Sequence, residues 1–153
     1  MRLSIVSTLY NTEPWLLEFH KRATKVAKEV SGEDYEIILV NDSSPDKVLD
    51  LAIKVTEDDS HVVVLDLSRN FGQHKAIMTG LEHARGEYLF YIDSDLEEEP
   101  ECLISFMMQM ENEHCDVVYG VQESRKGNGF ERLSGGLFYS IFNFVAGMRI
   151  PKN

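Results

Sequence analysis

Short apolar runs alternate along this chain with longer segments in which apolar residues recur every three or four positions. The short runs are rich in β-branched residues, which is typical of buried strands. The longer segments have the spacing of helices that bury one face, and Thr12 with Pro14 forms a candidate start for the first helix. We expect strands at 3–10, 35–40, 61–67, 87–92 and 115–120, and helices at 12–30, 47–58, about 74–84 and about 100–113.

Strands that alternate with helices predict an α/β fold, because right-handed crossover helices join parallel strands and cover both faces of the sheet. We therefore expect a single Rossmann-like domain with a mostly parallel sheet. Ligands of such open sheets bind beyond the carboxyl ends of the strands. Three of the predicted ends carry polar residues, in the segments STLYN (7–11), NDSSPD (41–46) and DSD (93–95).

Composition and charge narrow the class of protein. The chain has 153 residues, of which 43% are hydrophobic, and this fits one globular domain. Its two cysteines, Cys102 and Cys115, match neither a disulfide framework nor a paired Cys-x-x-Cys zinc site, so a reducing, cytoplasmic setting is the default.

The net charge of −11 is divided unevenly. Residues 1–120 contain 10 basic and 24 acidic side chains, whereas residues 121–153 contain 5 basic and 2 acidic ones. The acidic body excludes a nucleic-acid-binding protein, which needs a basic surface. We expect a core at 1–120 and a segment of different character at 121–153.

The segment 93–101 carries six carboxylates in nine residues, directly after a predicted strand. Side chains two apart in an extended segment point to the same side, so Asp93 and Asp95 can face one ion. Their mutual repulsion, roughly a few kcal/mol in a partly dry cleft, would be reversed by Mg²⁺ or Mn²⁺, which prefer oxygen ligands. The alternative is an acidic first helical turn, which we favour for Glu98, Glu99 and Glu101.

Four segments together resemble glycosyltransferase family 2, whose members use nucleotide sugars and have the GT-A fold. The nearest likeness is to synthases that load a hexose onto a polyprenyl phosphate, such as dolichyl-phosphate mannose synthase and bacterial undecaprenyl-phosphate glycosyltransferases. The resemblance covers nearly all of residues 3–150. Its motifs are YNTE (10–13), VNDSSPD (40–46), LSRNFGQHKAIMTGLEHARGEYLFYIDSDLEEEPE (67–101) and YGVQESRKG (119–127).

The resemblance implies a nucleotide site after the first two strands. Thr8, Tyr10 and Glu13 would flank the base, although Thr12 interrupts the usual Tyr-Asn-Glu order. Asp42 would form a hydrogen bond with the base. The alternatives are that Tyr10 only packs at the sheet end and that Asp42 forms a local Asx-turn.

The resemblance also implies the metal and phosphate contacts. Asp93 would contact the nucleotide, and Asp95, rather than Asp93, would be the direct ligand of Mg²⁺ or Mn²⁺. Glu97 stands where family members often have a glutamine that contacts the metal. Arg125 and Arg132 would contact the diphosphate or the acceptor, since arginine suits phosphate oxygens. Three residues are weaker candidates, because a turn with a helix cap and a solvated helix explain them equally well: Arg69, Asn70 and Lys75.

The segment 133–148 has no charged residue, but it is shorter than the ~20 residues that a membrane-spanning helix needs. Its aromatic residues and basic flanks suit a helix in a membrane interface. A helix packed on a protein domain explains the pattern equally well, and the resemblance favours the interface. The resemblance also indicates that the sequence is the N-terminal part of a longer protein.

These observations predict a metal-dependent, inverting hexosyltransferase at the cytosolic face of a membrane. Its donor would be a UDP- or GDP-linked sugar, and its acceptor a polyprenyl phosphate or, alternatively, a saccharide hydroxyl. A sugar nucleotidyltransferase would be expected to have a glycine-rich, basic phosphate loop near the first strand, which STLYNTEPW (7–15) lacks. A nucleotide-binding module without transfer activity is the non-enzymatic alternative.

Overall fold

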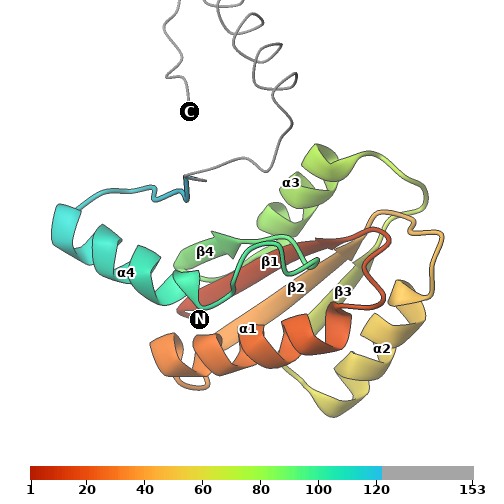
Figure 1. Cartoon of the computed structure of the whole chain (residues 1–153), viewed down its shortest axis with the longest axis horizontal. Helices are drawn as coiled ribbons and strands as arrows, with labels where there is room; N and C mark the ends of the chain where they lie inside the picture. The colour runs from red at the N-terminus through yellow and green to blue at the C-terminus, as the bar shows by residue number, and fades with distance from the viewer. Residues whose placement is uncertain (122–153) are drawn as a thin grey trace, which may run out of the picture. The chain divides into compact units, whose positions relative to one another are not determined.

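The computed structural model describes residues 1–121 of the chain, which form a parallel sheet flanked by helices (Figure 1). All four predicted helices and the first four predicted strands are present. The elements in chain order are β1 Leu3–Leu9, α1 Leu16–Ser31, β2 Tyr35–Asn41, α2 Val48–Asp58, β3 Val62–Asp66, α3 Gln73–His83, β4 Tyr88–Tyr91 and α4 Cys102–Glu113.

The strands lie in the order β3-β2-β1-β4 and every pair is parallel, which confirms the predicted α/β class. All seven residues of β1 and of β2 are buried, as their mainly apolar composition predicts for the centre of a parallel sheet. Leu9 pairs with Asn41, and Asn41 pairs with Asp66. The carboxyl ends of these strands therefore lie at one edge of the sheet, and the loops that follow them meet there.

Helices cover both faces of the sheet. α1, α2 and α4 pack on the face that carries Ile5 and Ile37, whereas α3 packs through Ala76 on the face that carries Val6 and Ile38. A Cβ atom at Gly80 of α3 would lie 2.4 Å from Cγ1 of Val6. The glycine therefore allows α3 to approach the sheet closely, so that its first turn lies at the carboxyl edge.

Two sequence predictions are wrong in detail. The expected strand at 115–120 is absent, and Val117 and Tyr119 are 75% and 76% exposed. A strand needs a neighbour to bond with, and none pairs with this segment within residues 1–121. The first helix begins at Leu16 rather than at Thr12, whose side chain does not cap it; instead, the Thr12 carbonyl accepts hydrogen bonds from the N–H groups of Trp15 and Leu16, at 3.1 and 3.2 Å.

Residues Met1–Cys115 form one compact unit. The boundary after residue 120 that the sequence predicts stays a prediction. Most of the segment 121–153 lies outside the described residues, including Arg125, Arg132 and the apolar segment 133–148. Among residues 1–121, no helix combines the length and the apolar character needed to cross a bilayer.

Candidate active site

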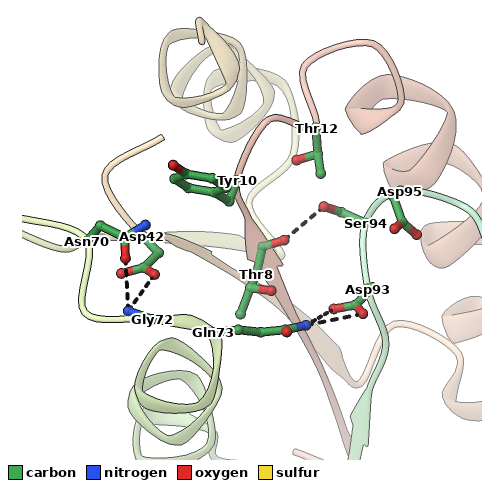
Figure 2. Close-up of a pocket in the computed structure, with 10 residues that line it drawn as sticks. All are labelled: Thr8, Tyr10, Thr12, Asp42, Asn70, Gly72, Gln73, Asp93, Ser94 and Asp95. Carbon is green, nitrogen blue, oxygen red and sulfur yellow. Dashed lines mark hydrogen bonds between the residues drawn. The ribbon is translucent and has the colours of Figure 1, made fainter. Parts of the chain in front are cut away.

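A cavity of about 430 Å³ opens at the carboxyl edge of the sheet (Figure 2). The end of β1, the residue after β2, the loop between β3 and α3, and the loop after β4 all contribute to it. Segments far apart in the sequence thus meet where an open parallel sheet binds its ligands. The lining residues are Thr8, Tyr10, Thr12, Asp42, Asn70, Gly72, Gln73, Asp93, Ser94 and Asp95.

Asp93 follows β4 by two residues and is held by two side chains from different elements. Gln73, at the start of α3, donates hydrogen bonds from Nε2 to both carboxylate oxygens, at 3.1 and 3.3 Å. The Tyr91 hydroxyl donates to Oδ1 of the same carboxylate. Burial and this hydrogen bond raise the pKa of Tyr91 to about 12, so the phenol keeps its proton at neutral pH and stays a donor.

Ser94 and Asp95 continue this loop across the end of β1. The Ser94 hydroxyl donates to the carbonyl of Thr8 at 2.8 Å, and Ser94 is only 1% exposed. This bond fixes the loop on β1, while the carboxylates on either side of Ser94 both line the cavity. Asp95 Oδ1 accepts the N–H of Glu97 at 3.0 Å, and Leu96 between them has a φ of 61°. Asp93 and Asp95 therefore share the cavity, as their spacing predicts.

Asp42 is 3% exposed and joins β2 to the loop before α3. Its two carboxylate oxygens accept the backbone N–H groups of Phe71 and Gly72, at 2.7 and 2.9 Å. Gly72 has a φ of +92°, a conformation that glycine adopts without strain. The local side-chain bond in this region is made by Asn41 instead, whose Oδ1 accepts the N–H of Ser44 at 3.1 Å. Asp42 thus shapes one wall of the cavity.

Glu13 and Glu97, two other predicted site residues, do not line the cavity. The Glu13 carboxylate accepts the N–H of Lys47, the residue before α2, at 3.1 Å. Glu97 is exposed on the loop after Asp95. In this structure Glu13 holds the start of α2, and the loop after β4 contributes two carboxylates to the cavity rather than three.

The carboxylates of the cavity have no basic partner among the described residues: none of the ion pairs there includes Asp42, Asp93 or Asp95. Desolvation raises the pKa of the nearby Glu98, and the charges of Asp93 and Asp95 raise it further. The cavity edge is therefore strongly negative and would attract a cation.

The donor set at this edge fits a hard divalent ion. Within residues 1–121 no group of three acidic, histidine or cysteine side chains could hold a metal alone. Mg²⁺, however, is usually bound by one or two carboxylates, with water and substrate phosphates completing its shell. Asp95 and Asp93 are the two oxygen donors that would hold such an ion here.

The sequence analysis missed Gln73, Ser94 and the cavity-facing position of Thr12. Thr12 and Ser94 lie in the loops that follow β1 and β4, which is a general signal, whereas Gln73 is the first residue of α3. The roles of all three depend on contacts between distant segments. Of the weaker candidates, Asn70 lines the cavity, whereas the Arg69 guanidinium lies 4.7 Å from the ring centroid of Phe71. Lys75 is an exposed residue of α3.

Comparison with known proteins decides the family. Residues 4–152 match the family described as Glycosyl transferase family 2, which covers nearly the whole chain. The chain belongs to glycosyltransferase family 2. This membership confirms the resemblance found in the sequence and favours it over the nucleotidyltransferase alternative.

Curated relatives agree with this family. A Mycobacterium tuberculosis (strain CDC 1551 / Oshkosh) protein, named among the glycosyltransferases, is 46% identical over 139 residues, or 91% of this chain and 40% of its own length. The undecaprenyl-phosphate 4-deoxy-4-formamido-L-arabinose transferase of Enterobacter sp. (strain 638) is 35% identical over 147 residues, or 95% of this chain and 44% of its own. The chain thus spans less than half the length of these relatives.

Solved structures share the fold. The Staphylococcus aureus protein TarS (residues 1–349) superposes with a TM-score of 0.65 at 24% identity, over 84% of this chain and 38% of its own. The mannosyltransferase PcManGT of Pyrobaculum calidifontis, solved with GDP-Man and Mn²⁺, gives a TM-score of 0.56 at 21% identity, over 61% of this chain and 27% of its own. The domain therefore has the GT-A fold.

Proposed function

We propose that the full protein transfers a hexose, with inversion, from a nucleoside diphosphate sugar to a polyprenyl phosphate. The observation that carries this proposal is the pairing of Asp93 and Asp95 on one cavity with Tyr10 and Asp42, at the carboxyl edge of the sheet. An aromatic side chain and a buried acid suit a nucleobase, and the two carboxylates suit the cation that accompanies a diphosphate.

The donor class is supported by structures of the same fold. TarS was solved with UDP and with UDP-GlcNAc, and PcManGT with GDP-Man and Mn²⁺. We propose that Thr8, Tyr10 and Asp42 bind the nucleoside, that Asp93 contacts the nucleotide and that Asp95 holds Mg²⁺ or Mn²⁺. A divalent ion bound there would neutralise charge that develops on the departing nucleoside diphosphate.

The reaction exchanges one bond at the anomeric carbon. An acceptor oxygen forms a bond to that carbon from the face opposite the diphosphate, and the bond from the carbon to the diphosphate oxygen breaks. The electron pair leaves with the nucleoside diphosphate. Gln73 and Tyr91 assist by holding the Asp93 carboxylate in one orientation through their hydrogen bonds.

The acceptor is inferred from the side chains on the cavity. Among residues 1–121, the side chains that line the cavity include no histidine, and the acids among them are Asp42, Asp93 and Asp95. Asp42 is bonded to two backbone N–H groups, and the other two are assigned to the nucleotide and the metal. A phosphate acceptor is already ionised at neutral pH and needs no general base, whereas a sugar hydroxyl needs one. The Enterobacter relative is named for an undecaprenyl phosphate.

A lipid acceptor would place the reaction at a membrane surface. We propose the cytosolic face, with the segment 133–148 at the interface and Arg125 and Arg132 near the phosphates of the donor or acceptor. These residues lie outside the described part of the chain. Their roles therefore rest on the basic and apolar character of the sequence alone.

A thermal-shift panel tests the donor site. UDP, GDP and their hexose conjugates are added to the protein with and without Mn²⁺. One diphosphate should raise Tm by several degrees when Mn²⁺ is present, because a ligand that binds only the native state stabilises it. Asp95→Asn should remove the Mn²⁺-dependent part of the shift, whereas Glu98→Gln, which changes an exposed acid outside the cavity, should keep it.

A transfer assay tests the acceptor. The responding sugar conjugate is incubated with undecaprenyl phosphate in detergent and, separately, with saccharides. A lipid-linked product would support the proposal, and a product formed only with saccharides would overturn the proposed acceptor. Binding without transfer to either class would favour a nucleotide-binding module. Failure of every nucleotide to shift Tm would overturn the donor site itself.

A further inference from the structure

Leu96 follows Asp95 in the loop after β4 and has a left-handed backbone conformation, with a φ of 61°. A residue with a large side chain rarely adopts this conformation, because its Cβ atom then lies too close to a carbonyl oxygen. Glycine would form the same turn without this strain. A leucine at this position therefore indicates that its side chain has a role there.

The Leu96 side chain packs against the protein core. It is partly buried and contacts the apolar cluster on the face of the sheet that α1, α2 and α4 cover. The next three residues, Glu97, Glu98 and Glu99, are all exposed. Leu96 is thus the residue through which the segment 95–99 makes apolar contact with the core.

Two polar contacts hold the same loop on either side of Leu96. The Ser94 hydroxyl donates to the carbonyl of Thr8 in β1 at 2.8 Å (Figure 2). Glu101, the residue before α4, accepts a hydrogen bond from Nε of Arg22 in α1 at 3.0 Å. Asp95 therefore lies between two fixed neighbours, Ser94 on β1 and Leu96 on the core.

The turn at Leu96 also orients the Asp95 carboxylate itself. Oδ1 of Asp95 accepts the N–H of Glu97 at 3.0 Å, and this bond spans Leu96. Such a bond, from a side chain to the N–H two residues later, forms only with suitable backbone angles at the residue between them. A carboxylate can accept about four bonds, so the Asp95 carboxylate keeps room for a metal ion.

We propose that Leu96 is a positioning residue for the metal site, because its left-handed turn and its packed side chain hold the Asp95 carboxylate at the cavity. The inference rests on the proposed function and deepens it. Leu96 is not among the residues that line the cavity, so it would act through Asp95 rather than by touching the metal or the nucleotide. Residues that orient a metal ligand in this way typically change metal affinity by about 10- to 100-fold.

Titration with Mn²⁺, followed by electron paramagnetic resonance in the presence of UDP or GDP, whichever shifts Tm, tests the inference. Leu96→Ala removes the apolar contact, so Kd for Mn²⁺ should rise by about 10-fold. Leu96→Gly forms the turn without strain but lacks the contact, so it should also bind Mn²⁺ more weakly. Leu96→Met keeps a large apolar side chain and should bind within about 2-fold of the unsubstituted protein.

Two controls separate positioning from a loss of stability. Ile104→Ala truncates another partly buried residue that packs against the same cluster, but from α4. Like Leu96→Ala, it should lower the midpoint of urea unfolding, yet it should leave Kd for Mn²⁺ unchanged. Affinity for the same nucleotide in EDTA should not change in Leu96→Ala, because the residues proposed to bind the nucleoside lie on other segments: Thr8, Tyr10 and Asp42.

Several results would overturn the inference. If Leu96→Ala or Leu96→Gly bound Mn²⁺ as tightly as the unsubstituted protein, the side chain would not be needed to position Asp95. If Leu96→Met bound as weakly as Leu96→Ala, apolar packing would not be the cause. Equal losses of Mn²⁺ affinity in Leu96→Ala and Ile104→Ala would indicate a general effect of reduced stability. Each differs from a failure of the proposed function, in which the unsubstituted protein binds no Mn²⁺ beyond that bound by the nucleotide.

Discussion

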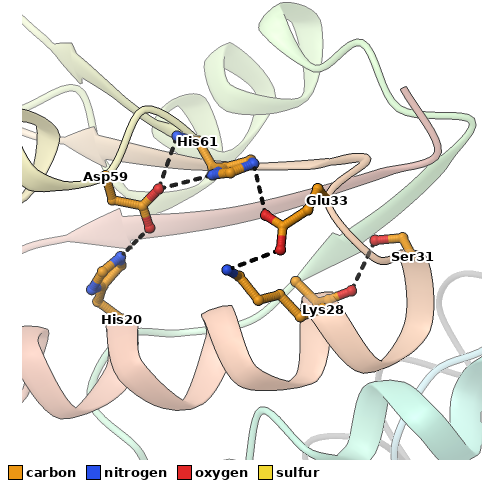
Figure 3. Close-up of polar contacts among 7 residues, drawn as sticks. His20, Lys28, Ser31, Glu33, Asp59 and His61 are labelled. Atoms are coloured by element: carbon orange, nitrogen blue, oxygen red, sulfur yellow. Dashed lines mark hydrogen bonds and ion pairs between the residues drawn. The ribbon is translucent and has the colours of Figure 1, made fainter.

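The two ends of the sheet hold their acidic side chains in different ways. At the amino ends of β2 and β3, acids have basic partners: Asp59 lies 2.9 Å from Nε2 of His20 and 3.0 Å from Nδ1 of His61, and Glu33 lies 3.1 Å from Nζ of Lys28 (Figure 3). At the carboxyl ends, the side chains within residues 1–121 that hold Asp93 are neutral donors.

A buried acid makes the same contrast sharper. Glu36, in β2, is 2% exposed and accepts hydrogen bonds from the Ser4 hydroxyl and from the N–H, Nε and Nη2 of Arg85, at distances of 2.7 to 3.1 Å. Burial alone would raise the pKa of Glu36, but the bonds from Arg85 and Ser4 outweigh it and hold the pKa below its ordinary value. Acids at the amino ends of the strands thus have basic partners, whereas Asp93 and Asp95 at the carboxyl ends form no ion pair within residues 1–121.

The largest expected effect comes from the carboxyl end. Changing Asp93 and Asp95 together to asparagine should weaken Mn²⁺-dependent nucleotide binding by about 100-fold or more, because charge stabilisation by a metal is worth several kcal/mol. The free energy of unfolding should be unchanged or raised, since two unpaired negative charges are removed. Calorimetry and urea unfolding measure the two quantities.

The matched control for that pair is Glu98→Gln with Glu99→Gln, which removes two exposed charges from the same segment. It should leave nucleotide affinity nearly unchanged. A similar loss in both pairs would mean that general negative charge, rather than a specific site, attracts the cation.

At the amino end, Glu36→Gln should show the reverse pattern. It should lower the free energy of unfolding by about 1–3 kcal/mol, because the charged hydrogen bonds to Arg85 are lost in a buried site. Nucleotide affinity measured below the unfolding transition should not change. Glu33→Gln is the control: Glu33 is 68% exposed, so its ion pairs should contribute at most about 1 kcal/mol. Equal losses in the two variants would contradict this view of Glu36.

Gln73→Ala tests the neutral donors around Asp93. It should lower metal-dependent affinity by about 10-fold, the smaller effect typical of a residue that orients a ligand. Gln109→Ala changes an exposed glutamine of α4 and should have no effect. If Gln73→Ala bound nucleotide normally, Tyr91 alone would be sufficient to orient Asp93.

Lowering the pH should gradually reduce the stability that the acids at the amino ends of the strands contribute. Asp59 has a folded-state pKa below its ordinary value: burial opposes this shift, but the hydrogen bonds from His61 and His20 outweigh it. A carboxyl with a lowered pKa binds fewer protons when folded, so its contribution is complete above its unfolded pKa, about 4, and is lost as pH falls through the folded value. Unfolding free energy below about pH 4 should fall by at most about 1.4 kcal/mol per pH unit for each such group. Glu36 also has a lowered pKa, so the unfolding free energy of Glu36→Gln should fall less steeply with pH. An unchanged dependence on pH would mean that Glu36 does not contribute to it.

The succession of strands and helices along the chain was predictable from the sequence. Buried strands are short apolar runs, and helices that bury one face repeat apolar residues every three or four positions. The segment Tyr35–Asn41 is buried throughout, as its mainly apolar composition predicts. The segment 115–120 has a similar composition, yet it is not a strand within the described residues. A strand forms there only if a neighbouring strand is available for backbone hydrogen bonds. The sequence of one segment does not show whether such a neighbour is present.

The site was predictable to a similar degree. Asp42, Asp93 and Asp95 follow strands, so the position of the cavity followed from topology. The bond between Gln73 and Asp93 joins residues 20 apart, and no local pattern encodes it. Glu13 and Thr12 are neighbours in the motif, and the sequence alone does not distinguish their roles. In the structure Glu13 holds the start of α2, whereas Thr12 lines the cavity.

The central claim is that the acids at the carboxyl end bind a divalent ion together with the nucleotide. Electron paramagnetic resonance of Mn²⁺ tests it directly, because the signal of free Mn²⁺ falls as the ion is bound. With the nucleotide that shifts Tm, the protein should lower the free Mn²⁺ signal well beyond the effect of nucleotide alone, and the Asp93→Asn, Asp95→Asn variant should not. An equal decrease with the unsubstituted protein and the variant, or none beyond that of the nucleotide, would contradict the account.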